Sequence, residues 1–91
     1  MELERLRKNI DQLDSMIISL LAKRSDMVAA AATLKKNEQG VRDPKRVEQV
    51  IEKVRAKAVE SGLDPEIAEK TYRTLIDCFI QKEMSLFKRS E

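Results

Sequence analysis

Apolar side chains recur every three or four residues along the first third of the chain. The stripe consists of Leu3, Leu6, Ile10, Leu13, Ile17, Leu20, Met27, Ala31 and Leu34, and it is interrupted only at Arg24. This spacing is typical of one face of an amphipathic helix, and neither glycine nor proline occurs before Gly40. The pattern predicts one helix from about Glu2 to Lys36, ending in the polar segment 37–40.

Two further helices carry the same start signal, an aspartate that can cap the helix followed by a proline at its first position. The second begins at Asp43-Pro44 and stops at Ser61-Gly62, and the third begins at Asp64-Pro65 and runs to the end. Their apolar stripes are Val47, Val50, Ile51, Val54 and Ala58, then Ile67, Ala68, Tyr72, Leu75, Ile76, Phe79, Ile80 and Leu86. We therefore predict an all-α fold, a three-helix protomer in a single domain, residues 1–91.

The first helix is too long for a compact protein of this size. Thirty-five residues extend about 50 Å as a helix, whereas a globule of 91 residues is roughly 30 Å across. The helix must protrude, and a protruding apolar stripe exposes more surface than monomers usually tolerate. We expect an intertwined homodimer in which the long helices pair.

Composition narrows the classes of function. The 18 basic and 16 acidic residues are scattered along the chain, which disfavours nucleic-acid binding. No segment approaches the roughly 20 apolar residues of a membrane span, and no apolar signal core opens the chain. We expect a cytoplasmic protein that binds neither nucleic acid nor membrane.

The chain has no histidine and one cysteine, Cys78. This excludes disulfide frameworks, nearly all zinc sites and the triads that depend on an imidazole base. We expect Cys78 to be a small core residue, and any catalysis to proceed without metal and without histidine.

Arg24 is the most informative position, because it occupies a place where the stripe requires an apolar residue. On a regular helix, Ala31 and Lys35 fall within about 20° of it, so two cations flank a methyl-sized gap. A half-buried guanidinium requires a partner anion, and the nearest acids, Asp26 and Glu38, are not on its face. The sequence predicts an anion pocket whose anion is a ligand.

Three more charged residues are candidates for this pocket. Arg7 lies about 25 Å along the helix from Arg24, so it reaches the pocket only from the partner of an antiparallel dimer; otherwise it is an ordinary exposed arginine. Glu83 falls on the apolar stripe of the last helix, where it faces inward or else turns outward to pair with Lys82 or with a lysine of the partner. Arg46 points toward the same cavity or is simply exposed.

Several short segments together resemble the all-helical chorismate mutases that form intertwined dimers. They are Leu6-Arg7, Ile10-Asp11-Gln12-Leu13-Asp14, Leu20-Leu21-Ala22-Lys23-Arg24, Lys35, Val41-Arg42-Asp43 with Arg46, and Gly62-Leu63-Asp64. The resemblance spans essentially the whole chain. It implies two active sites per homodimer and the Claisen rearrangement of chorismate to prephenate, a step of aromatic amino acid biosynthesis, with no cofactor.

The resemblance also implies roles for the matching positions. Arg7 of the partner chain and Arg24 would bind the two substrate carboxylates, and Lys35 would bind a carboxylate and the ether oxygen. Glu83 would meet that oxygen from the other side. Two further substrate-binding positions follow: Arg46 would support the pocket, and Asp43 would lie by the ring hydroxyl.

The chain departs from this family at two positions. Better-known members have a glutamine at the position of Glu83, and an ionised carboxylate cannot donate a hydrogen bond to the ether oxygen. Glu83 would have to be protonated, so we expect activity to increase as pH falls. Val47 replaces a glutamate that in some relatives helps to bind the ring hydroxyl, which leaves Asp43 and backbone groups for that task.

Three alternatives remain open on the sequence. The related isochorismate-pyruvate lyases cleave isochorismate to salicylate and pyruvate, and they also tend to be apolar at the position of Val47. A second variant would rearrange 4-amino-4-deoxychorismate, whose ammonium group Asp43 would meet. The third is a helical dimerisation module without a ligand, in which Arg24→Leu would stabilise the dimer at no cost in function.

Overall fold

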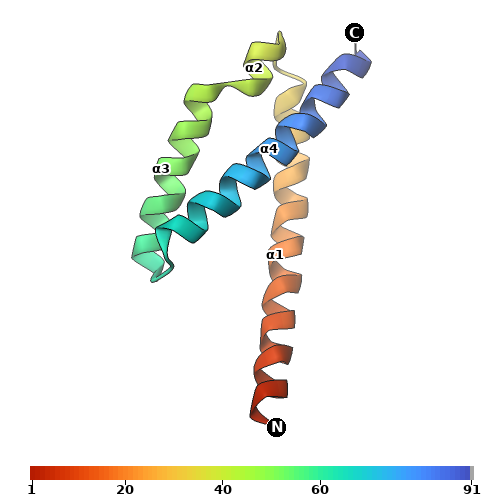
Figure 1. Ribbon diagram of the computed structural model, residues 1–91. Helices are drawn as coiled ribbons and strands as arrows, with labels where there is room; N and C mark the ends of the chain where they lie inside the picture. Colours follow the sequence, from red (N-terminus) through yellow and green to blue (C-terminus); the bar gives the residue numbers. More distant parts are fainter. Residues whose placement is uncertain (91) are drawn as a thin grey trace.

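The computed structural model describes residues 1–90, and the side chains of residues 1–89. The described chain forms α1 (Glu2–Ala32), α2 (Glu38–Arg42), α3 (Pro44–Ser61) and α4 (Pro65–Ser90), as Figure 1 shows. It contains no strand. The predicted all-α class is confirmed, and three long helices correspond to the three predicted ones.

The caps expected for α3 and α4 are present. Asp43 Oδ1 accepts a hydrogen bond from the backbone N–H of Arg46 at 3.2 Å, and Asp64 Oδ1 accepts one from Glu66 at 2.9 Å. Gly62 ends α3 in the left-handed conformation, with φ of 81°, which a residue without Cβ adopts at no steric cost. The two Asp-Pro signals and the Ser-Gly stop therefore mark the helix boundaries correctly.

The end of α1 differs from the prediction. The helix stops at Ala32, so Lys35 lies in the connection to α2, and the segment expected to be a polar break contains the short helix α2. The side chain of Asn37 caps α2 by accepting a hydrogen bond from Gly40 N at 2.8 Å. Asparagine offers the backbone such local bonds in place of a continuing helix, and Val41, only 2% exposed, anchors the new helix.

Helix α4 is the centre of the protomer, because α1, α2 and α3 each pack against it. In Figure 1, α3 and α4 form a hairpin, and α4 crosses the C-terminal half of α1. The buried apolar residues are few: Ala32, Val41, Ile51, Ala58, Ala68, Ile76 and Met84. Cys78 is exposed on α4, so the expectation of a core cysteine was wrong.

Helix α1 protrudes from this core, as its length predicted. The molecule measures 55 × 25 × 15 Å, and the N-terminal half of α1 extends away from the α3–α4 hairpin (Figure 1). The stripe residues Leu3, Leu6, Ile10, Leu13, Ile17 and Leu20 are each at least half exposed in the protomer. None of the described helices is long and apolar enough to span a membrane.

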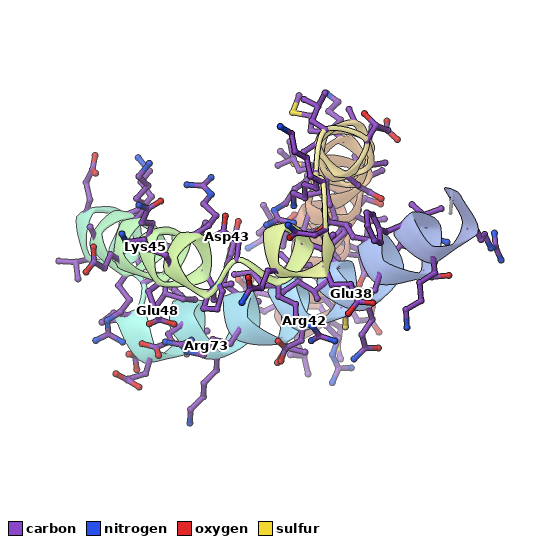
Figure 2. The ribbon with its side chains drawn as sticks, turned by 90° about the horizontal axis from the view of Figure 1, so that it is seen from above. Glu38, Arg42, Asp43, Lys45, Glu48 and Arg73 are labelled. Atoms are coloured by element: carbon purple, nitrogen blue, oxygen red, sulfur yellow. The ribbon has the colours of Figure 1, made fainter. Side chains whose placement is uncertain are left out.

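A network of ion pairs joins α3 to α4 on the outside of the hairpin. Arg73 binds both carboxylate oxygens of Glu48 at 3.0 Å and donates from Nε to Glu69 at 2.8 Å; Figure 2 shows Glu48 facing Arg73. Arg55 bridges Glu66 and Glu69. The hydrogen bonds from Arg73 hold the pKa values of Glu48 and Glu69 below their usual value of 4.5.

This network makes part of the stability dependent on pH. Carboxyl groups with a lowered pKa in the folded state stabilise the protein above the unfolded value and lose that contribution as pH falls below it. We expect the melting temperature to fall below about pH 4.5, and Arg73→Gln to reduce this fall while lowering the neutral melting temperature by at most a few degrees. Thermal unfolding followed by circular dichroism measures both, with Arg89→Gln as the exposed control. Parallel curves for wild type and Arg73→Gln would contradict the assignment.

Candidate active site

A cavity of about 390 Å³ lies where the C-terminal half of α1 and the α1–α2 connection meet α2, α3 and α4. Its volume is within the range of small-molecule sites, roughly 300–1,000 Å³. The charged lining residues are Arg24, Lys35, Arg42, Asp43, Arg46 and Glu83, and the apolar ones are Val28, Ala31, Val41, Val47, Val50, Ile76, Phe79 and Ile80. Four cations and two acids leave a formal excess of positive charge, which suits an anionic ligand.

Arg24 reaches this cavity from α1 and is half-buried. Its Nη1 atom is buried and has no hydrogen-bond acceptor among the described residues. Burying such a donor without an acceptor is costly, and an acceptor supplied by an anionic ligand would remove that cost. The interrupted stripe therefore correctly identified a cation that lines a cavity.

Lys35 and Glu83 form an ion pair in the wall of the cavity. Lys35 Nζ donates to Glu83 Oε1 at 2.7 Å, and the side chains are 27% and 6% exposed. Glu83 thus faces inward, as predicted, but its partner is Lys35 and not Lys82. Lys35 reaches the cavity from the α1–α2 connection. The prediction that it continues the helix of Arg24 was wrong, but both residues line the same cavity.

The position of Lys35 depends on the close approach of α2. A Cβ placed on Gly40 would lie 3.6 Å from Cβ of Lys35 and 3.9 Å from its Cγ. Helix α2 therefore packs against the apolar stem of Lys35. Its residue Val41 is buried, and α2 also packs against α4.

Asp43 forms the corner between α2 and α3, as Figure 2 shows. It adopts the left-handed conformation, with φ of 30° and ψ of 71°, which aspartate tolerates better than most residues. Its backbone N–H donates to Gln39 O at 2.8 Å, and its side chain caps α3 at Arg46. The corner places Asp43 and Arg46, two predicted site residues, at the rim of the cavity, where each is exposed.

Arg7 is the one predicted site residue that does not line the cavity of its own chain. It is exposed on α1, and the seventeen residues that separate it from Arg24 span about 25 Å of helix. One protomer thus brings together Arg24, Lys35, Asp43, Arg46 and Glu83, and a contribution from Arg7 requires a second chain.

The sequence did not identify every lining residue as a site residue, and Arg42 and Phe79 are the two informative cases. In the sequence, Arg42 is only part of the segment Val41-Arg42-Asp43 that resembles the family. Its place in the last turn of α2 brings it to the cavity. Phe79 had been assigned to the apolar stripe, but its ring centroid lies 5.0 Å from Cζ of Arg24. Its spacing of seven residues from Tyr72 was the available signal for a shared partner.

Among residues 1–89, no group of histidine, cysteine, aspartate or glutamate side chains is arranged to hold a metal ion. The cavity offers four cations and two carboxylates to a small ligand. The fold and the site thus define an all-helical protein with a cationic cavity for a small ligand.

The chain belongs to the type II chorismate mutase family, since residues 6–84 match that family. It is 31% identical over 78 residues to a chorismate mutase of Methanocaldococcus jannaschii, which covers 84% of this chain and 78% of the relative. It is also 28% identical over 85 residues to an isochorismate pyruvate lyase of Pseudomonas aeruginosa, which covers 93% of this chain and 84% of the relative. The resemblance found in the sequence is thus confirmed at the level of the family.

Proposed function

We propose that this protein is a chorismate mutase, an isomerase that converts chorismate to prephenate. The observation that carries the proposal is the cationic cavity in which a buried nitrogen of Arg24 has no acceptor among the described residues. The family and the relative from M. jannaschii support the same activity. We place the reaction in the cytoplasm, because the single thiol of Cys78 suits a reducing compartment.

The rearrangement suits a site made of cations and hydrogen-bond donors. A carbon–oxygen bond breaks while a carbon–carbon bond forms within one molecule, so no external nucleophile, reductant or proton is consumed. The enzyme must hold an extended dianion in a compact chair and stabilise the negative charge that grows on the ether oxygen. A planar guanidinium group binds a carboxylate through two parallel hydrogen bonds, whereas an ammonium group suits a single oxygen.

The residues of the cavity take the following roles in this proposal. Arg24 binds one carboxylate, and Lys35 contacts a carboxylate and the ether oxygen. Glu83, protonated, donates to that oxygen from the other side. Asp43 faces the ring hydroxyl, and Arg46 supports the rim of the pocket.

A homodimer completes the site in this proposal. The exposed stripe on α1 provides an apolar surface for a second copy, and in an antiparallel pair Arg7 of one chain lies beside Arg24 of the other. Arg7 then binds the second substrate carboxylate, so each of two sites contains residues of both chains.

A second candidate is the cleavage of isochorismate to salicylate and pyruvate. The relative from P. aeruginosa is named an isochorismate pyruvate lyase. In addition, Val47 gives the cavity an apolar wall where a glutamate would recognise a ring hydroxyl. The same clamp of cations would bind either dianion, so the products must distinguish the two activities.

The first prediction of the proposed function concerns the reaction products. Purified protein given chorismate and isochorismate separately, at about pH 5 and about pH 7.5, should form prephenate from chorismate, with products identified by NMR. Arg24→Leu should lower this turnover about 100-fold or more, because it removes a charged ligand of the transition state, whereas Arg89→Leu, an exposed control on α4, should leave it unchanged.

Other outcomes reassign the protein. Salicylate and pyruvate as the dominant fast products would favour the lyase. If neither substrate reacts and Arg24→Leu tightens association between copies, the chain is a dimerisation module and the proposed activity is wrong.

The second prediction concerns pH. Glu83 faces Lys35 in its ion pair, and Arg24 on α1, Arg42 on α2 and Arg46 on α3 line the same cavity, together with Asp43. Because only the protonated form donates to the ether oxygen, activity should rise as pH falls, by up to about tenfold per unit while the group is mostly ionised.

Glu83→Gln should flatten this profile, since an amide donates at every pH. The measurement is kcat for chorismate across the pH range in both proteins. A wild-type rate that is flat, or that rises toward alkaline pH, would refute the role of protonated Glu83.

The third prediction concerns the shared site. Arg7→Ala and Arg24→Ala should each be inactive alone. Mixed after unfolding and refolding together, they should recover roughly a quarter of wild-type activity, because half of the dimers are mixed and each of those has one intact site. Refolding either variant alone is the control, and no recovery on mixing would show that Arg7 does not act in the site of its partner.

A further inference from the structure

The guanidinium of Arg24 contacts two aromatic rings of α4. Its Cζ lies 5.0 Å from the ring centroid of Phe79 and 5.9 Å from that of Tyr72. The two residues are seven apart, about 10.5 Å along a helix. Both rings thus contact the same guanidinium.

This contact holds a half-buried arginine without an acid. None of the ion pairs of the described residues includes Arg24, and its Nη1 has no acceptor among them. The face of an aromatic ring attracts a cation without occupying its N–H donors. The rings therefore hold the guanidinium while leaving those donors available to a ligand.

Lys35 shows the contrasting arrangement in the same cavity. Its ammonium donates to Glu83, so a ligand must compete with a carboxylate for it. A carboxylate beside Arg24 would impose the same competition and would also repel the anionic ligand. Two aromatic rings avoid both effects.

We propose that Tyr72 and Phe79 are positioning residues that orient the Arg24 guanidinium for the carboxylate of a dianionic substrate. The proposal rests on the proposed function for the identity of the ligand. The two rings differ in one useful respect. Phe79 lines the cavity, whereas Tyr72 does not, so Tyr72 affects a ligand through Arg24 and not by contact.

Tyr72→Leu is therefore the decisive variant, and Tyr72→Phe is its matched control. Removing the ring should lower kcat/KM for chorismate by about 3- to 30-fold, the size expected of a cation–π contact. The change should lie mainly in KM, because the carboxylate is bound in the ground state as well as in the transition state. Tyr72→Phe keeps the ring and should stay within about twofold of wild type, and Phe79→Leu tests the second ring.

A second measurement is independent of activity. Protons held over an aromatic face resonate upfield, so the Arg24 Hε signal in NMR of the ligand-free protein should be shifted upfield. In Tyr72→Leu it should lose part of this shift, since the nearer ring of Phe79 remains, and in Tyr72→Phe it should keep the full shift. The same spectra report whether Tyr72→Leu is folded.

The outcomes separate the two proposals. If the wild-type protein acts on neither chorismate nor isochorismate, the proposed function fails, while the Arg24 signal still tests its ring contacts. If the wild type is active but folded Tyr72→Leu keeps the wild-type KM, or Tyr72→Phe loses as much as Tyr72→Leu, the positioning role is wrong. An unshifted Arg24 signal in the wild type would refute it directly.

Discussion

The cavity depends on a buried carboxylate. Glu83 of α4 is almost fully removed from water, which is tolerable for a charged group only beside a cation. Lys35 provides that cation from the connection after α1 and so ties this connection to α4. Helix α2 packs on the stem of Lys35, and Asp43, the next residue after α2, forms the corner to α3. One ion pair thus sets where the walls of the cavity meet.

In the site that we propose, Lys35 and Arg24 would divide two requirements that conflict wherever a protein binds a dianion. Uncompensated charge makes a site attractive to an anion but destabilises the folded protein without its ligand. Lys35 is compensated by Glu83 and contributes to the ligand-free fold, whereas Arg24 is held by aromatic faces and keeps a buried donor without an acceptor among the described residues. Stability and affinity are therefore assigned to different cations.

Much of this arrangement could be predicted from the sequence, since it follows from local signals. The Asp-Pro starts mark α3 and α4, and charged residues at apolar positions identified Arg24 and Glu83. The sequence could not place Lys35, because α1 ends at Ala32 and the helical register stops before Lys35. The Asn37 cap of α2 and the burial of Val41 belong to the new path of the chain. The pairing of Lys35 with Glu83 spans 48 positions, and the contact of Arg24 with Phe79 likewise depends on how α1 crosses α4. No local pattern encodes either.

The N-terminal half of α1 has a further consequence for how the chain folds. Residues 1–20 are all exposed in the protomer, so this segment gains nothing from tertiary burial, and an isolated helix of that length is only marginally stable in water. Its helical content is therefore set by whatever covers its apolar stripe. If a second copy covers it, secondary structure and assembly form in one cooperative event, and the helicity of the chain becomes a function of its concentration.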